Sequence, residues 1–443
     1  MGAETALPVQ EAVVFAVPHG SKPGFLRLRT RPSLNRQTNT MNPSDLIDRF
    51  RERTAAEKLV LASLALVEVA PGKSRLVEYL RQGGFRSQAD IAYTNASIDN
   101  VLSGLIQVGL VDNTAEGGFR CASAVPVSAL RGAMADGTFN KICDAVDTVD
   151  RANSSVGRSH PTNAHNARVL LRMALLRQRE MVDVHRCLSS LFETIHTYDQ
   201  HPYIELFGRP FDPEFLALLL PEAQQEVLSL LLRDALHRLA PVAPLAQAVQ
   251  RLLGASKTPA ALFMPVYAEL CLLCGRFDQA IELAGSHEDA SAQLIRSAAW
   301  LLKGDLAGAI TGFEAALKTL RAASGKRQVV FGGFCGYLHV LALLRSGDER
   351  LKKKAQVFMA LGLRTSGANL LVFNRLQFFN DVNRGTRRLI DRDNQSAPKE
   401  PVGQLLAGLI DDWIGAPRSL LQDTALAELG LKAEAAGFHF IAV

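Results

Sequence analysis

The sequence predicts a mostly α-helical protein in which a small helical domain with one β-hairpin precedes a long series of helix pairs. Its 443 residues are 48% hydrophobic and only 7% aromatic, and alanine and leucine dominate, which is typical of helical proteins. Apolar residues recur at three- and four-residue steps, and glycines separate the resulting segments. This length allows two or three domains with sizeable cores.

The first forty residues differ from the rest of the chain. No acidic residue lies between Glu11 and Asp45, and basic residues occur among Pro, Ser, Asn and Thr without a helical period. An amphipathic targeting pattern and a secretory apolar stretch are both missing. We therefore expect residues 1–40 to be a disordered tail, or an over-extended start that precedes the natural first residue, Met41.

Residues 41–150 contain three helical segments and then a hairpin. Thr54 is a plausible cap of the first helix, and Gly83 and Gly84 end the second. Two short apolar runs around Gly117 and Gly118 follow the third helix and indicate paired strands. This order predicts a winged-helix-like domain. The third helix is expected to turn these side chains to the core: Ile98, Val101, Leu102, Leu105 and Ile106.

The third helix of a winged-helix domain often reads DNA, and the charges here argue against that role. No Lys or Arg lies between Ile91 and Phe119, whereas Asp99, Asp112 and Glu116 would repel phosphates. We favour a winged helix that packs or binds protein over one that reads the major groove.

Residues 151–443 form a series of helical segments, three of which share one plan. Each consists of a helix, a turn and a second helix, and the turns are centred on Gly275, Gly304 and Gly347. The helix after Gly304 has one apolar stripe, which a neighbouring helix pair must cover. The stripe consists of Leu306, Ala309, Ile310, Phe313, Ala316, Leu317 and Leu320.

The segment around Gly304 resembles the tetratricopeptide repeat (TPR). In that family small residues let two helices approach closely, and an aromatic residue fills the gap between helix pairs. The resemblance is carried by Gly304, Ala309, Phe313 and Ala316, and the neighbouring segments keep fewer of these features. It covers residues 260–365 and implies a degenerate TPR-like α-solenoid.

The last residues of the sequence allow two interpretations. A helix and a turn at Gly437 are followed by an apolar run up to Val443, without a polar capping helix. We expect either a solenoid truncated at its C-terminus or a short terminal strand or tail that packs on the body of the protein.

The motifs that usually carry chemistry are incomplete. Gly72, Lys73 and Ser74 lack the glycine five residues earlier that a phosphate-binding loop requires, so Lys73 is expected to be solvated at a helix start. Cys271 and Cys274 lie on one helix without further ligands at zinc-site spacing. His160, His165, His196 and His201 are expected in loops or at helix ends. No catalytic residue, metal site or cofactor is predicted, and we expect the chain not to be an enzyme.

Charge gives the candidate binding residues. From Lys318 to Asp393 there are 15 Lys and Arg against 5 Asp and Glu, although the whole chain carries a net charge of only +5. Such a segment could hold nucleic-acid phosphates or an acidic partner, or it could simply be a solvated outer face. The candidates are Lys326, Arg327, Lys352, Lys353, Lys354, Arg384, Arg387 and Arg388.

Three stretches resemble the non-motor N-terminal region of large bacterial Swi/Snf-family helicases. They are "DNVLSGLIQVGLVDNTAEGGFRCASAV", "ALRGAMADGTFNKICDAV" and "YIELFGRPFDPEFLALLLPEAQQEV". The resemblance implies a non-catalytic scaffold that binds a protein partner or nucleic acid without reading its sequence, with a motor following in the full-length protein.

The alternative hypothesis is a signalling or transcriptional regulator related to large LuxR-type activators, which also combine winged-helix and TPR-like parts. The chain lacks the nucleotide-binding domain and the basic recognition helix of that class. In either case no apolar run reaches the ~18 residues that span a bilayer, and six scattered cysteines favour a cytoplasmic location.

Overall fold

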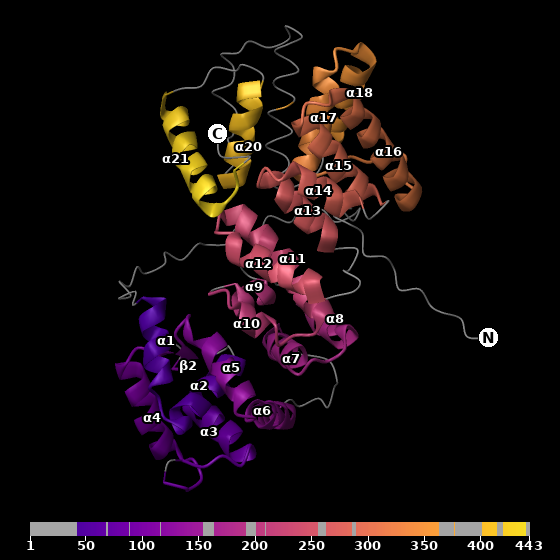
Figure 1. Ribbon diagram of the computed structural model, residues 1–443. Coiled ribbons are helices and arrows are strands. Elements are labelled where there is room, and N and C mark those ends of the chain that lie inside the picture. The colour runs from indigo at the N-terminus through magenta and orange to yellow at the C-terminus, as the bar shows by residue number, and fades with distance from the viewer. Residues whose placement is uncertain are drawn as a thin grey trace, which may run out of the picture. The chain divides into compact units, whose positions relative to one another are not determined.

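The computed structural model describes residues 42–67, 70–87, 89–115, 117–153, 164–191, 201–208, 210–255, 263–285, 289–362, 376, 401–413 and 420–439. These residues are mostly helical and include one two-stranded sheet, so the predicted α-rich fold is confirmed. The chain divides into two compact units after Leu231, within a helix (Figure 1). We call the described residues 42–231 the N-terminal unit and residues 232–439 the C-terminal unit.

The N-terminal unit begins with four helices and a hairpin. These elements are α1 (Pro43–Arg51), α2 (Ala55–Val67), α3 (Lys73–Gln82), α4 (Asn95–Gln107), β1 (Val111–Asn113) and β2 (Phe119–Cys121). Seven helices follow, of which the last continues into the C-terminal unit. They are α5 (Val125–Ala135), α6 (Phe139–Asn153), α7 (Ala164–Leu176), α8 (Met181–Ser189), α9 (Pro202–Phe207), α10 (Pro213–Leu216) and α11 (Pro221–Arg238).

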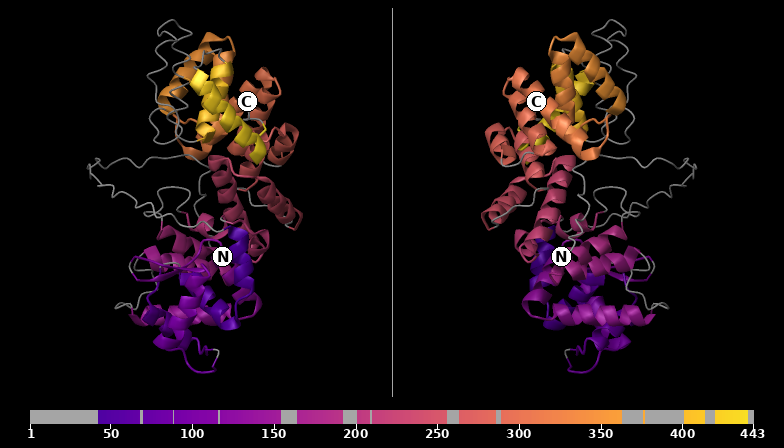
Figure 2. Two further views of the ribbon diagram at one scale, coloured as in Figure 1. Left: turned by 90° about the vertical axis from the view of Figure 1, so that its left-hand side faces the viewer. Right: turned by 90° about the vertical axis from the view of Figure 1, so that its right-hand side faces the viewer.

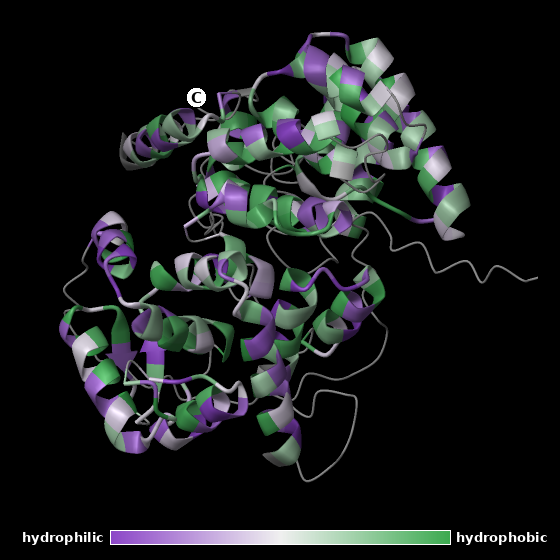
Figure 3. Cartoon of the chain, turned by 60° about the horizontal axis from the view of Figure 1, so that its bottom comes forward, coloured by the Kyte–Doolittle hydropathy of each residue, from purple (hydrophilic) through white to green (hydrophobic). Residues whose placement is uncertain are grey.

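Helix α2 is the centre of the N-terminal unit. It starts with a reciprocal cap, since the Glu57 amide donates to Thr54 Oγ1 at 3.3 Å and the Thr54 amide donates to Glu57 Oε2 at 2.8 Å. The predicted cap is therefore confirmed. All residues from Val60 to Val67 are buried, because α3, α5, α6, α7 and β2 pack around the helix. Helices of this unit show hydrophobic and hydrophilic residues side by side in Figure 3, as expected for helices with one buried face.

The predicted hairpin is confirmed. β1 and β2 are antiparallel, with Val111 opposite Cys121 and Asn113 opposite Phe119. Gly117 has a φ of 78°, which glycine tolerates best. A side chain at Gly118 would lie 2.2 Å from the carbonyl oxygen of Ala70, so this turn is pressed against the backbone that precedes α3.

The predicted core face of α4 is correct for three of its five residues. Ile98, Leu102 and Leu105 are buried, and Val101 is half-buried. Ile106 is 39% exposed, so that part of the prediction is wrong. It follows Leu105 directly, and one residue turns an α-helix by about 100°, which carries its side chain away from the core.

The C-terminal unit is entirely helical in its described residues. Its helices after α11 are α12 (Ala243–Ala255), α13 (Phe263–Leu273), α14 (Phe277–Gly285), α15 (Ala290–Leu302), α16 (Leu306–Ser324), α17 (Gly333–Arg345), α18 (Glu349–Gly362), α20 (Pro401–Trp413) and α21 (Leu420–Ala436). Phe438, just beyond α21, is fully buried. The sequence after residue 439 and residues 1–40 lie outside the described part of the chain.

Helices α13 to α18 form three consecutive antiparallel pairs that pack on one another. Figure 1 labels these helices, and Figure 2 draws them in the same colours from two further sides. α13 packs on α14, α15 on α16 and α17 on α18, while α15 also contacts α13, α14 and α17. The turn glycines Gly275, Gly304 and Gly347 have φ values of 73°, 93° and 76°, which side chains disfavour. The predicted plan of helix, glycine turn and helix is confirmed at all three turns.

The apolar stripe of α16 faces its neighbours as predicted. Ala309, Phe313, Ala316 and Leu317 are fully buried, and the three remaining residues of the stripe are half-buried. The alanines admit close approach of α15, and the Phe313 ring extends to α17, where it lies 4.9 Å from the His339 ring.

α15 and α16 approach each other closely at Gly312. An added methyl group there would lie 2.2 Å from Ser297 Oγ and 3.0 Å from Trp300 Cζ3. Ser297 is fully buried and its hydroxyl donates to the Gln293 carbonyl at 2.6 Å, so it cannot easily move aside. Gly312→Ala is expected to destabilise the C-terminal unit by about 1–3 kcal/mol through overpacking, as measured by urea unfolding.

The matched control is Gly254→Ala on α12, where nothing lies within 4 Å of an added methyl group. Alanine is the better helix former, so this variant is expected to be neutral or up to about 1 kcal/mol more stable. Equal effects of the two substitutions would contradict the close approach at Gly312.

Candidate interaction surface

The turn between α17 and α18 positions the predicted lysine run. Asp348 caps α18, since its carboxylate accepts from the Arg350 amide at 2.7 Å and its carbonyl accepts from the Lys352 amide at 3.0 Å. The Asp348 amide in turn donates to Ser346 Oγ at 3.2 Å. These bonds fix the first turn of α18 and thereby the directions of its basic side chains.

Two of the three predicted lysines of this run are held in ion pairs. Lys352 Nζ lies 2.8 Å from Glu349 Oε1 on the same helix. Lys354 pairs with Glu314 on α16 and lies 5.9 Å from the centre of the Phe358 ring. Lys354 therefore joins two helix pairs, and its charge is partly neutralised. Lys353 is exposed, and no ion pair joins it to a described residue.

The structure adds two arginines to Lys353. Arg345 ends α17 and Arg350 lies in the first turn of α18, and both side chains are exposed without an ion pair to a described residue. We call Arg345, Arg350 and Lys353 the α17–α18 basic surface. The two arginines do not belong to the lysine run, so the sequence pattern does not point to them. Arg350 could have been identified because it lies one helical step of three residues before Lys353.

The other predicted basic residues are elsewhere. Lys326 and Arg327 are exposed in the segment between α16 and α17, at the opposite end of α17 from Lys353. The 13 residues of α17 separate these ends by about 20 Å at 1.5 Å per residue. The described residues thus form two separate basic areas. Arg384, Arg387 and Arg388 lie outside the described residues, as do Phe373, Phe378 and Phe379.

An ion pair between α3 and α4 involves Lys73, which was expected to be solvated. Lys73, at the start of α3, has its Nζ 2.6 Å from Asp99 Oδ1, so it is paired and not simply solvated. This pair offsets the negative charge of Asp99. On the hairpin, Asp112 stands opposite Arg120. The exposed residues of α4, among them Asn100 and Ile106, are uncharged, and they offer no cation to a phosphate.

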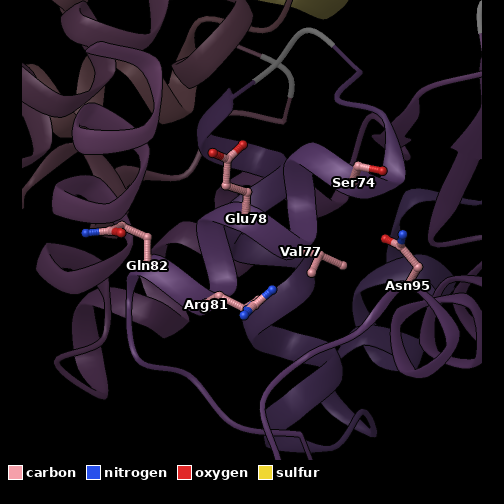
Figure 4. Close-up of a pocket in the computed structure, with 6 residues that line it drawn as sticks. All are labelled: Ser74, Val77, Glu78, Arg81, Gln82 and Asn95. Atoms are coloured by element: carbon pink, nitrogen blue, oxygen red, sulfur yellow. The ribbon is translucent and has the colours of Figure 1, made fainter. Parts of the chain in front are cut away.

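An open groove of about 540 Å³ lies between α3 and the start of α4 (Figure 4). Its lining is mainly polar, and Glu78 in it is 3.4 Å from Arg75. The lining residues are Ser74, Val77, Glu78, Arg81, Gln82 and Asn95. The groove could accept hydrogen-bonding groups of a partner, but it contains no arrangement of acid, base and nucleophile.

A polar network joins helices α7, α8, α9 and α11 within the N-terminal unit. Glu226 accepts from Tyr203 Oη at 3.3 Å and lies 2.6 Å from His185 Nε2. His201 caps α9, as its Nδ1 accepts from the Tyr203 amide at 3.2 Å. Burial, together with the nearby Arg168, lowers the pKa of His201 to about 4. The network connects four helices, and we assign it a structural role.

The cysteines are arranged as core residues. All six are free, and all but Cys187 are buried. Cys271 lies on α13, whereas Cys274 lies in the turn after it, so the expectation that both lie on one helix is wrong. Burial raises the pKa of Cys271 to about 12 and that of Cys274 to about 11, which disfavours the thiolate that metals and electrophiles require. Among the described residues no three His, Cys, Asp or Glu side chains gather in a way that could hold a metal ion.

No family model matches this chain, and no curated protein or solved structure is similar to it. Among the helices that the structure describes, none has the length and apolar character to cross a bilayer.

Proposed function

We propose that this chain is a non-catalytic scaffold whose TPR-like stack, α13 to α18, binds nucleic acid without reading its sequence. The observation that carries the proposal is the α17–α18 basic surface, where the exposed Arg345, Arg350 and Lys353 flank a capped turn and form no ion pair with a described residue. Phosphate groups bind such exposed cations through charge and release of counterions, which requires no contact with bases.

In this proposal the N-terminal unit contains a winged-helix-like domain with a protein-docking role. The order α2, α3, α4, β1 and β2 supports that architecture, and the uncharged outer side of α4 favours a protein over a duplex. The sequence resemblance supports a place next to a Swi/Snf-type motor. Free cysteines favour a reducing compartment such as the cytoplasm.

The test is binding of the full chain to a labelled duplex and a labelled single strand at two salt concentrations. Arg345→Glu, Arg350→Glu and Lys353→Glu are combined in one variant. Each lost duplex phosphate contact makes the negative slope of log K against log salt shallower by about 0.9, so the slope of the variant is expected to be about 3 units less negative than that of the wild type.

A matched control makes the same net charge change at exposed positions that do not belong to the α17–α18 basic surface: Lys141→Glu, Arg179→Glu and Lys432→Glu. The slope of this control is expected to differ from that of the wild type by no more than the contribution of one phosphate contact, about 0.9. Equal binding by the wild type and the α17–α18 variant would rule out nucleic acid at this surface. If the α17–α18 variant instead binds nucleic acid like the wild type but loses binding to an acidic protein, the partner of the scaffold at this surface is a protein.

A further inference from the structure

His339 lies inside the packed helices α16, α17 and α18. It is 1% exposed, and neither Nδ1 nor Nε2 has a hydrogen-bond partner among the described residues. A neutral imidazole has one donor and one acceptor, so this position leaves both without compensation. A leucine or phenylalanine would fill the same space without this penalty, which makes the histidine a candidate for more than packing.

Three aromatic rings surround the imidazole. The ring of Phe313 on α16 is 4.9 Å away, that of Phe358 on α18 is 5.0 Å away, and that of Phe331, just before α17, is 5.7 Å away. No carboxylate or carbonyl accepts a hydrogen bond from it in the described structure. The surroundings therefore favour the neutral ring over an imidazolium ion.

The ionisable groups near the ring also oppose its protonation. α16 contributes Glu314 and Arg321, and α18 contributes Lys354, which is paired with Glu314. The net charge of these three groups is positive. Burial, followed by Lys354 and Arg321, lowers the pKa of His339 to about 3.

We infer that His339 is an acid-sensitive latch of the C-terminal unit, whose protonation from solvent releases the packing of α18 on α16 and α17. A proton on the ring would add a positive charge among three phenylalanine rings, close enough to Lys354 and Arg321 to be repelled by both. The helices can accommodate this charge only by opening and admitting water. Opening exposes Phe313, Phe331 and Phe358 together.

The direction of the pH effect follows from the two states. The histidine pKa is 6.5 in the unfolded chain and about 3 in the folded one, so the latch is fully closed above pH 6.5. Below that pH the opening constant is expected to rise about tenfold per pH unit until the folded pKa is reached. Between pH 7.5 and 5.0 this amounts to about thirtyfold.

Hydrogen exchange of the full chain, followed by mass spectrometry at pH 7.5 and 5.0 and corrected for intrinsic rates, measures this opening. Peptides from α17 and α18 are expected to lose about thirtyfold in protection in the wild type. His339→Leu is expected to remove this loss. The exposed His439 provides the matched control, because His439→Leu is the same substitution in the same unit and is expected to behave as wild type.

Equal loss of protection in the wild type and in His339→Leu would overturn the inference. Peptides containing His201 supply an internal reference, since their own response to acid is expected to be the same in both proteins. If His339→Leu does not fold, NMR of histidine-labelled wild type decides: the His339 ring signal is expected not to titrate between pH 7.5 and 5.0 in the folded protein. A normal titration near pH 6.5 refutes the latch.

Discussion

Phe313→Ala is expected to lower the free energy of unfolding of the C-terminal unit by about 3–5 kcal/mol. The ring is fully buried between α16 and α17, and Ala309, Ala316 and Leu317 around it on α16 are buried as well. The surrounding backbone is helical and cannot collapse onto the missing ring, so the loss includes both the transfer of the ring from water and a cavity. The measurement is urea unfolding.

Tryptophan fluorescence makes this measurement specific. The chain contains two tryptophans, Trp300 and Trp413, and both lie in the C-terminal unit. Val357→Ala on α18 is the control, because Val357 is 54% exposed and its truncation is expected to change stability by less than about 0.5 kcal/mol. A loss of under about 1 kcal/mol for Phe313→Ala would contradict the stacking of helix pairs around this ring.

The sequence predicted the features that depend on local chemistry. Gly275, Gly304 and Gly347 could be identified as turns because each adopts a positive φ that other residues avoid. The stripe from Leu306 to Leu320 could be predicted because an α-helix brings residues three and four apart onto one face. Thr54 could be predicted as a helix cap because a threonine that precedes a helix accepts a hydrogen bond from its first amides.

Contacts between distant segments could not be predicted. Lys354 belongs to a run of three lysines, and nothing in that run shows that Glu314, forty residues earlier, neutralises it. Likewise, nothing in the sequence indicates that Lys73 and Asp99 form an ion pair, because the two residues meet only where α3 and α4 pack together. The candidate basic residues could therefore be chosen from composition, but which of them lie close together depends on the fold. The role of His339 could not be predicted, because a single histidine in an apolar helix belongs to no recognisable sequence motif.

Arg172 on α7 is the second residue whose loss is expected to have a large effect. It is only 7% exposed, and its Nη1 donates to the Ala65 carbonyl at 2.6 Å. Ala65 lies in the last turn of α2, whose final carbonyls have no partner within the helix. The arginine thus completes the hydrogen bonding of a buried helix end from a position 107 residues along the chain.

Arg172→Met is expected to destabilise the N-terminal unit by about 2–3 kcal/mol. Methionine keeps the apolar stem and relieves the cost of burying a charge, which alone would favour the variant. The Ala65 carbonyl cannot be removed by substitution, however, so it stays buried without a donor, and we expect this penalty to dominate. Reduced exchange protection of α2 peptides measures the effect, with the exposed Arg179→Met as control. Unchanged protection of α2 would mean that water reaches Ala65, and the helix end would then not depend on α7.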